Sequence, residues 1–269
     1  MTTMQCPADR RQNALLAGIP ESTWSRWQPR LRSIDLSCGQ ALSRSGVLSR
    51  QVIFPTTAIV SLVWATSDGA SAEVGVIGSD GVVSISQGRG RGAMTSEFVV
   101  QGAGHGYLLP TTEVAAELAD GGQVRTLLLD YSQALFAQVA QTALCNRYHS
   151  IEQQFARRLL LGLDRARSDQ LTMTHESMAR LLGVRREGVS AAAFKMQKAG
   201  VIRYSRGRLV VRDREELKQR ACECYAVTTA EHAAVLPTGV GTWGPGRNAV
   251  TVDRAMRVDR PGDSVGAAC

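Results

Sequence analysis

Short apolar runs separated by glycine-containing turns fill residues 50–110 of the chain. The runs Ala58–Ala65 and Ala72–Ile77 are rich in β-branched residues, and Asp68-Gly69 lies between them, which is a β-hairpin signal. Many short strands with glycine between them predict an antiparallel β-roll or barrel. Further short strands are expected at Val82–Ile85, Glu97–Gln101 and Gly106–Leu109.

Helical patterns stand on both sides of this region. The segment Pro20–Leu31 begins at a proline and places Trp24 and Trp27 on one face, which predicts an opening helix. A short helix is expected at Thr112–Leu118, where a pair of glycines would end it.

A long helical pattern then runs from about Val124 to Arg147 and carries two apolar stripes. One stripe can pack on the roll and the other on a second copy of the chain, so we expect a homodimer joined along this helix. The alternative is a helix that is buried wholly within one subunit. The first stripe is Leu128, Leu135 and Thr142, and the second is Phe136, Ala140 and Ala143.

The chain is expected to bend after the long helix and to lose its order near the C-terminal end. A hinge is expected at Asn146–His149, and Ser150 and Gln153 have the spacing of a capping box that opens another helix, through about Arg167. From about residue 226 the chain is rich in Gly, Ala and Thr, and its apolar residues show no period. We therefore expect a disordered tail at 226–269.

Residues 174–190 meet the requirements of a helix-turn-helix. Ala179 is small enough for two helices to cross there, and Gly183 supplies a turn residue that tolerates positive φ. Thr174 is a suitable N-cap for the first helix. The apolar inner face consists of Met178, Leu182, Val184 and Val189.

The same pattern leaves Arg185, Arg186, Glu187 and Ser190 on the face that would meet DNA. Arginine is suited to bidentate hydrogen bonding with guanine, and glutamate accepts from cytosine N4. We expect Arg186 and Glu187 to read bases, because a recognition helix meets base edges near its start. Arg185 can read a base or hold a phosphate, and Ser190 can reach either. For Glu187 the alternative is a carboxylate that only orients Arg186.

A β-hairpin wing is expected after the helix-turn-helix, with strands at Val201–Tyr204 and Leu209–Val211. Arg206 and Arg208 at its tip would approach phosphates, which adds affinity and salt dependence but no sequence readout. We also expect phosphate contacts from Thr174 and from Lys195, for which a merely solvated side chain is the alternative.

The positive charge of the chain belongs almost entirely to this segment. The net charge is +7, and residues 171–225 hold 12 Lys+Arg against 6 Asp+Glu, whereas residues 1–170 hold 15 against 14. Such a concentration of cations is the electrostatic footprint of a protein that binds a polyanion. Together with the helix-turn-helix, it predicts double-stranded DNA as the partner.

Cysteine usage and hydropathy indicate a cytoplasmic protein. No apolar run approaches the roughly 18–20 residues that a membrane span needs, and the first residues do not have the pattern of a secretory signal. Cys222 and Cys224 are separated by one residue, which is not the spacing of a zinc or redox pair. We therefore expect free thiols and no metal, with a metal or redox role as the alternative.

These motifs resemble those of the Crp/Fnr family of bacterial transcription regulators. The resemblance rests on LTMTHESMARLLGVRREGVS, on QKAGVIRYSRGRLVVRD and on the closing CECY, and it covers about residues 14–226. It implies a homodimer that binds a roughly palindromic operator and works with RNA polymerase. It also implies that Arg186, Glu187 and Ser190 match the base-reading positions, while Ala191 stands where many members have arginine.

The sensor region departs from the cyclic-nucleotide-binding members of that family. Those members carry a Gly-Glu pair and then an Arg followed by small residues, which hold the ribose and the phosphate. Here Gly78 has no such Glu after it, and the arginines available as substitutes are Arg89 and Arg91. We take these three as candidate effector-binding residues and expect no cofactor, with a cyclic nucleotide as the less favoured alternative. His105 is expected to be structural or exposed, not a haem ligand.

The expected fold class is therefore α+β: an antiparallel, cyclic-nucleotide-binding-like β-roll at 14–122, a long dimerisation helix at 123–148 and a winged helix-turn-helix domain at 149–225. We expect a homodimeric, sequence-specific transcription regulator and not an enzyme, because the roll shows no paired carboxylates, metal spacing or nucleophile–base arrangement. Glu73, Asp80 and Glu97 are isolated and are expected to be surface charges. The alternatives are a non-specific architectural DNA binder and a cyclic-nucleotide-responsive signalling module.

Overall fold

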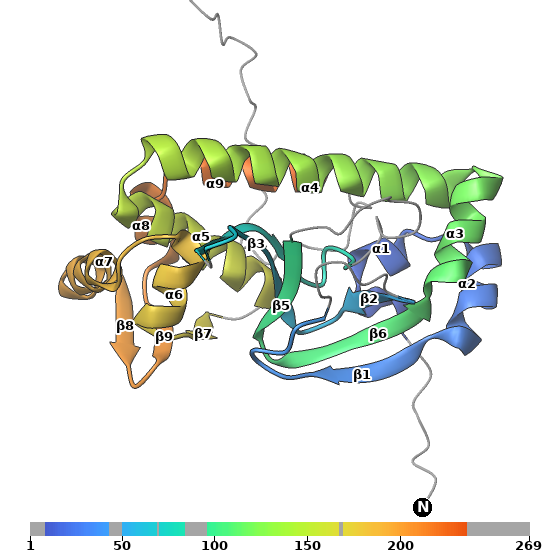
Figure 1. Ribbon diagram of the computed structural model, residues 1–269, viewed down its shortest axis with the longest axis horizontal. Coiled ribbons are helices and arrows are strands. Elements are labelled where there is room, and N and C mark those ends of the chain that lie inside the picture. The colour runs from blue at the N-terminus through green and yellow to red at the C-terminus, as the bar shows by residue number, and fades with distance from the viewer. Residues whose placement is uncertain (1–8, 43–49, 69, 84–95, 167–168, 236–269) are drawn as a thin grey trace, which may run out of the picture.

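The computed structural model describes residues 9–42, 50–68, 70–83, 96–166 and 169–235. A β-rich N-terminal half and a mainly helical C-terminal half lie side by side beneath one long helix, α4 (Gln123–Tyr148) (Figure 1). The C-terminal half contains its own small wing sheet. This arrangement confirms the expected α+β class.

Two three-stranded antiparallel sheets form the N-terminal half, with strand orders β1-β6-β2 and β4-β3-β5. Their registers bring apolar residues together: Phe54 lies opposite Tyr107, and Val60 lies between Ile77 and Val100. The expected strand at residues 82–85 is present only as an isolated bridge at Val83, and residues 84–85 lie outside the described ranges. The strands are β1 (Arg32–Leu36), β2 (Gln51–Pro55), β3 (Ile59–Ala65), β4 (Ser71–Ile77), β5 (Ser96–Gly102) and β6 (Gly104–Pro110).

Short helices close the ends of this half. The expected opening helix is α2, and it is shorter than its pattern because a turn of 3-10 helix, η2, follows at Pro29; Trp24 and Trp27 are buried, as their shared face predicted. The elements are η1 (Arg10–Gln12), α1 (Ala14–Ala17), α2 (Glu21–Trp27), η2 (Gln28–Arg30) and α3 (Thr111–Asp120).

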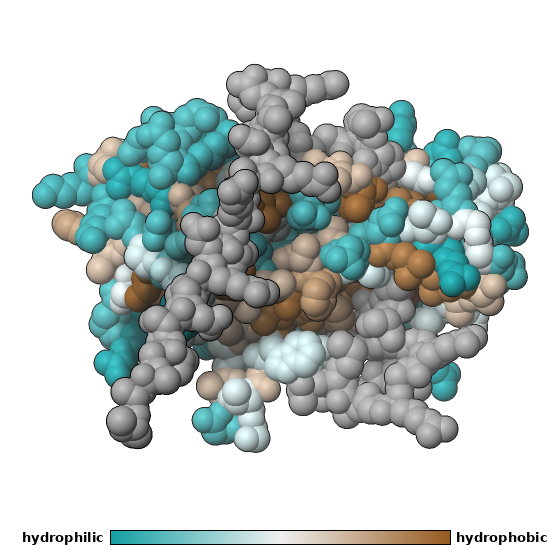
Figure 2. Space-filling view, turned by 90° about the horizontal axis from the view of Figure 1, so that it is seen from above, coloured by the Kyte–Doolittle hydropathy of each residue, from teal (hydrophilic) through white to brown (hydrophobic). Residues whose placement is uncertain are grey.

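The long helix α4 has one buried face and one exposed apolar face. Gly121 and Gly122, both with positive φ, end α3 and turn the chain into α4. The stripe that includes Leu128 and Thr142 packs inward, whereas large side chains on the other face stay in solvent. Figure 2 looks down on the side along which α4 runs and shows hydrophobic surface between polar regions. The large exposed side chains of α4 are Leu129, Phe136, Leu144 and Tyr148.

The C-terminal half begins at the expected capping box. Ser150 Oγ accepts from Gln153 N (3.3 Å), and Gln153 Oε1 accepts from Ser150 N (3.0 Å). The half is a helical bundle with the sheet β7-β9-β8 at its edge. Its elements are α5 (Ile151–Ala166), β7 (Gln170–Thr172), α6 (His175–Leu182), α7 (Arg186–Lys198), β8 (Ile202–Ser205), β9 (Arg208–Val211), α8 (Arg214–Arg220) and α9 (Cys224–Val235).

The prediction of a disordered tail from residue 226 is wrong for residues 226–235, because these residues belong to helix α9. The helix packs along α4 through Cys224, Thr228 and His232, which are four residues apart and buried. The buried face of α9 was not predicted, because it consists of cysteine, threonine and histidine and not of large aliphatic residues. Residues 236–269 lie outside the described residues.

One hydrophobic cluster joins the two halves. Ile59 and Val76 of the β-rich half pack in the same cluster as Phe155 and Leu159 of α5 and Val189 of α7. The two halves therefore share a core and are not merely linked by the chain. Among the described helices, none has both the length and the apolar character that crossing a bilayer requires.

Candidate nucleic-acid interface

The first helix of the helix-turn-helix, α6, is closed at both ends by the residues expected from the sequence. Thr174 Oγ1 accepts from Ser177 N (3.0 Å), and Ser177 Oγ in turn accepts from Thr174 N (3.0 Å), which makes a capping box. Gly183 ends the helix in the left-handed region, at φ 65°. Ala179 is buried where α6 meets α7. The local structure of the motif therefore follows from its sequence.

The second helix, α7, has sharply different faces. Val189, Ala192, Ala193 and Met196 are buried, in step with a helical period. Arg186, Glu187 and Ala191 are exposed on the opposite face, and Arg185 is exposed at the N-cap. An amphipathic helix whose polar face begins with such side chains has the form of a recognition helix.

Ser190, also proposed as a base reader, is half-buried and has a partner within the protein. His175 Nδ1 lies 3.0 Å from Ser190 Oγ, and the His175 ring stacks on Tyr204 with centroids 4.4 Å apart. Burial, and then the charge of Arg186, lower the pKa of His175. A neutral His175 thus joins the start of α6, the middle of α7 and the wing.

The wing is a tight hairpin fastened to the start of α6. Arg206 and Gly207 at its tip both have positive φ, 49° and 78°, as in the two-residue turns that suit the twist of a hairpin. Met173 N donates to Gly207 O (2.7 Å), and the Tyr204 hydroxyl donates to Met173 O (2.9 Å). Arg206 and Arg208 are exposed. Two cations therefore lie on a hairpin that is hydrogen-bonded to the segment before α6.

The two remaining residues predicted to contact phosphate, Thr174 and Lys195, are both exposed, but each has a partner within the protein. Thr174 is exposed, although its hydroxyl is engaged in the capping box. Lys195 is also exposed, but its ammonium lies 3.5 Å from a carboxylate oxygen of Glu152. Phe194, which was not among the predicted contacts, is two-thirds exposed on the same face of α7 as Arg186. The i, i+4 spacing from Ser190 would have revealed it.

The predicted effector site is only partly described. Arg89 and Arg91 lie outside the described residues. Gly78 is buried, and a Cβ added there would lie 2.6 Å from the Arg165 Cβ, so its lack of a side chain lets α5 approach closely. His105 is exposed and pairs with Asp35 (2.7 Å), as expected for a structural or surface histidine.

Two of the three carboxylates predicted as isolated surface charges are instead in contact with α5. Glu73 is buried, bonded to the Ser61 hydroxyl and to the buried Arg158 guanidinium, whose Nη2 lies 2.9 Å away. Asp80 lies 3.1 Å from Arg165. The prediction failed because the partners are 85 residues distant along the chain. Glu97 is exposed, as predicted.

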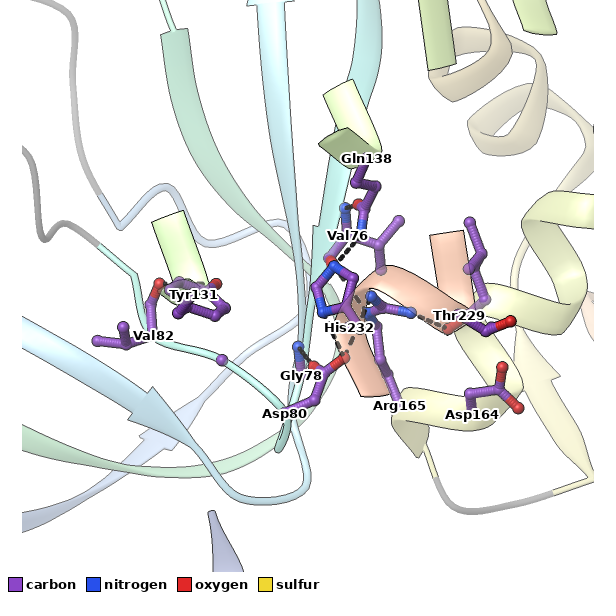
Figure 3. A network of polar contacts seen from close by, with 12 residues as sticks. Val76, Gly78, Asp80, Val82, Tyr131, Gln138, Asp164, Arg165, Thr229 and His232 are labelled. Carbon is purple, nitrogen blue, oxygen red and sulfur yellow. Dashed lines mark hydrogen bonds and ion pairs between the residues drawn. The ribbon is translucent and has the colours of Figure 1, made fainter. Parts of the chain in front are cut away.

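Asp80 and Arg165 belong to a network that also reaches α4 and α9 (Figure 3). Gln138 Oε1 accepts from Val76 N, so the Gln138 amide nitrogen is the group that faces His232 Nε2, and it donates to that atom (3.1 Å). The hydrogen of the His232 ring is therefore on Nδ1, which lies 3.7 Å from a carboxylate oxygen of Asp80. Burial lowers the pKa of His232 to about 4, so the ring is neutral at pH 7. Burial opposes ionisation of Asp80, but the charge of Arg165, together with the Gly78 N–H, lowers the pKa of its carboxyl.

Comparison with known proteins agrees with this geometry. Residues 153–220 match the family model of the Crp-like helix-turn-helix domain. No curated protein matches the chain.

Solved structures share the fold at low sequence identity. FixK2 from Bradyrhizobium japonicum is 16% identical, with a TM-score of 0.61, covering 71% of this chain and 98% of its own. The c-di-GMP-responsive global regulator CLP from Xanthomonas campestris is 14% identical, with a TM-score of 0.56, covering 71% and 99%. TTHA1359, a Crp/Fnr-family transcriptional regulator from Thermus thermophilus, is 18% identical, with a TM-score of 0.54, covering 71% and 98%.

The domain match and the shared fold agree with the motifs and with the form of α6, α7 and the wing. Residues 153–220 form a Crp-like helix-turn-helix domain, and the chain shares the fold of FixK2 and of the Crp/Fnr-family regulator TTHA1359.

Proposed function

We propose that the protein is a homodimeric regulator that recognises a two-fold symmetric operator, with α7 of each copy in the major groove. The observation that carries this proposal is the exposed face of α7, where Arg186 and Glu187 stand unburied at the helix start beside a cationic wing tip. Base edges are read by side chains in just this position. As a transcription regulator, the protein would act on RNA polymerase.

Within this face, the base contacts fall to different kinds of side chain. Arg186 would pair with guanine, Glu187 would accept from cytosine, and Arg185 would read a neighbouring base or hold a phosphate. A hydroxyl offers more than one hydrogen-bonding position, so Ser190 can contact DNA while it keeps its bond to His175. Ala191 leaves room but no hydrogen bond at a position where many family members have arginine.

Affinity without sequence readout would come from the wing and the edges of the motif. Arg206 and Arg208 are carried by a hairpin that is hydrogen-bonded to Met173, just before α6, and they would meet the DNA backbone beside the groove. Thr174 and Lys195 would add weaker contacts, since each has a partner within the protein.

The dimer would form along the exposed apolar face of α4. Phe136 is 66% exposed and Leu129 is 54% exposed, and seven residues separate them, which is the repeat of a two-helix seam. Isolated exposed apolar residues are ordinary, but a stripe of large ones along a helix marks an interface. Pairing of the two helices would set the distance between the two copies of α7, which must be about 34 Å to reach successive turns of the major groove.

The sensor would respond to an effector other than a cyclic nucleotide, or to none. No Glu follows Gly78, and Arg165 of α5 packs against Gly78 and pairs with Asp80. Through these contacts, a change in the N-terminal half would move α5, the first helix of the DNA-binding half.

The proposal is tested by selecting duplexes from a random pool with the full chain, with and without cyclic nucleotides. We expect a site with two inverted half-sites about 10–10.5 base pairs apart, bound by two chains, and no dependence on the nucleotide. Equal affinity for the selected site and for random duplex, measured at the same salt concentration, would instead identify a non-specific binder. A complex with one chain per duplex would contradict the dimer.

A further inference from the structure

Four side chains with metal-binding chemistry meet where α4 ends and α9 begins. They are Cys145 near the end of α4, His149 just after it, Cys222 before α9 and Cys224 at its start. Their sulfur and nitrogen atoms all lie within 4.8 Å of one another. The three cysteines are buried, and the histidine is mostly so. The cluster cannot be recognised from the spacing of Cys222 and Cys224, because its other two members, Cys145 and His149, lie more than seventy residues earlier in the chain.

The separations within the cluster fit one tetrahedral metal ion. Zinc binds sulfur at about 2.3 Å and imidazole nitrogen at about 2.0–2.1 Å, which at the tetrahedral angle places ligand atoms roughly 3.6–3.8 Å apart. Cys145 Sγ lies 3.5 Å from Cys222 Sγ, and Cys224 Sγ lies 3.4 Å from His149 Nδ1. A cluster of several metal ions would need ligands spread more widely than these.

The surroundings of the four residues are those of a metal site. His149 Nε2 lies 3.2 Å from a carboxylate oxygen of Glu223, so the histidine donates to Glu223 and keeps its Nδ1 lone pair toward the cysteines. Carboxylates orient metal-binding histidines in this way. Gln141 Nε2 also lies 3.0 Å from Cys224 Sγ and can donate to a thiolate. The sequence offers no spacing that would reveal these contacts.

Charge balance points the same way. Three thiolates, a neutral imidazole and a divalent cation together carry one negative charge. The guanidinium of Arg157, on α5, is buried, and its Nε has no hydrogen-bond partner in the described structure. Arg157 Nη2 also donates to Thr142 Oγ1 of α4 (2.9 Å), about one helical turn before Cys145. The net negative charge of the metal-bound site would compensate this buried cation.

We propose that Cys145, His149, Cys222 and Cys224 bind one Zn²⁺ ion. Soft thiolate and imidazole ligands in a tetrahedral arrangement favour zinc among the common divalent ions, and four protein ligands leave no open position, so the site is structural. On binding, the three thiols release their protons to solvent while His149 coordinates as the neutral ring. The ion joins α9 to the end of α4, at the bend from which the DNA-binding half departs.

The test is metal content and spectroscopy of the full chain, purified under reducing conditions. We expect one zinc per chain by elemental mass spectrometry, and after replacement by Co²⁺ the visible bands of tetrahedral cobalt with sulfur-to-metal charge transfer. Cys145→Ser and Cys222→Ser should each abolish high-affinity binding, whereas Cys38→Ser, at an exposed cysteine outside the cluster, should leave one equivalent bound.

Two further measurements keep the proposal open to refutation even where a cysteine variant fails to fold. Glu223→Gln should weaken zinc affinity by about 10–100-fold, because it loosens His149 without removing a ligand. The cobalt spectrum of the wild-type chain needs no variant. Failure of the reduced chain to take up zinc or cobalt would overturn the proposal, as would a Cys145–Cys222 disulfide in protein whose thiols are alkylated at the moment of cell lysis.

Discussion

Two sets of arginines in the C-terminal half have opposite surroundings. Those of α7 and the wing, such as Arg186 and Arg206, stand in solvent. Those of α5, Arg157, Arg158 and Arg165, are at most 5% exposed. The exposed set can meet phosphates at little desolvation cost. The buried set holds the two halves of the molecule together, because Arg158 pairs with Glu73 and Arg165 with Asp80.

This difference shows what a count of charges can and cannot reveal. Residues 1–170 are nearly neutral by count, yet part of that neutrality consists of buried ion pairs between the β-rich half and α5. Within residues 171–225, Arg186, Arg206 and Arg208 of α7 and the wing are exposed, whereas Arg214 of α8 pairs with Asp164 of α5. Breaking a buried pair should therefore affect the fold, and removing an exposed arginine should affect DNA binding.

The largest effect is expected from Glu73→Gln. The change leaves the Arg158 guanidinium buried without its counter-charge, which typically destabilises a protein by about 3–5 kcal/mol. The measurement is a urea titration followed by tryptophan fluorescence, since Trp24 and Trp27 are buried in the same half. We expect a lower midpoint of the fluorescence transition.

Glu97→Gln is the matched control for that experiment, because it makes the same chemical change on the strand β5 at an exposed position. It should leave the midpoint within the range of ordinary surface substitutions, about 0.5 kcal/mol. Equal effects of the two variants would show that the Glu73–Arg158 pair does not contribute to joining the halves.

The two sets also differ in how well the sequence predicts them. The exposed set follows from local patterns: Ala179 and Gly183 fix the turn, and the apolar period of α7 leaves Arg186 outside. The helices and the wing were therefore predicted to within a few residues. Local rules suffice there because the capping, turn and helical contacts all join residues close in the chain.

The buried set could not be predicted, because its partners come from distant segments. Nothing near Glu73 in the sequence points to Arg158, and nothing near Cys145 points to Cys222. The helix α9 was not predicted for a related reason. Its buried face, which includes Cys224 and His232, is stabilised by contacts with α4, a segment distant in the sequence. Long-range polar contacts leave no period in the sequence.

A middle-sized effect is expected from Arg186→Ala, which tests the exposed set. If Arg186 reads a guanine, the variant should lose about 1–3 kcal/mol of binding free energy and tolerate any base at one position of each half-site. Affinity for the selected operator and for its single-base variants, measured by fluorescence anisotropy, provides the check.

The control is Arg125→Ala, which removes an exposed arginine from the other end of the molecule, near the start of α4 (Figure 1). It should bind like the wild-type chain. Normal binding and unchanged base preference in Arg186→Ala would show that α7 does not present this residue to a base.

The smallest effect is expected from Arg206→Ala at the wing tip. Loss of one phosphate contact should weaken all sequences alike and reduce the slope of log affinity against log salt by about 1. Arg206 has a positive φ, which a glycine adopts without strain, so a distorted wing can be distinguished from a lost charge. Arg206→Gly and Arg206→Ala should lose the same affinity, and Arg206→Lys should keep the salt slope. A loss confined to one sequence would mean that the wing reads bases, and the division between base-reading helix and phosphate-binding wing would have to be redrawn.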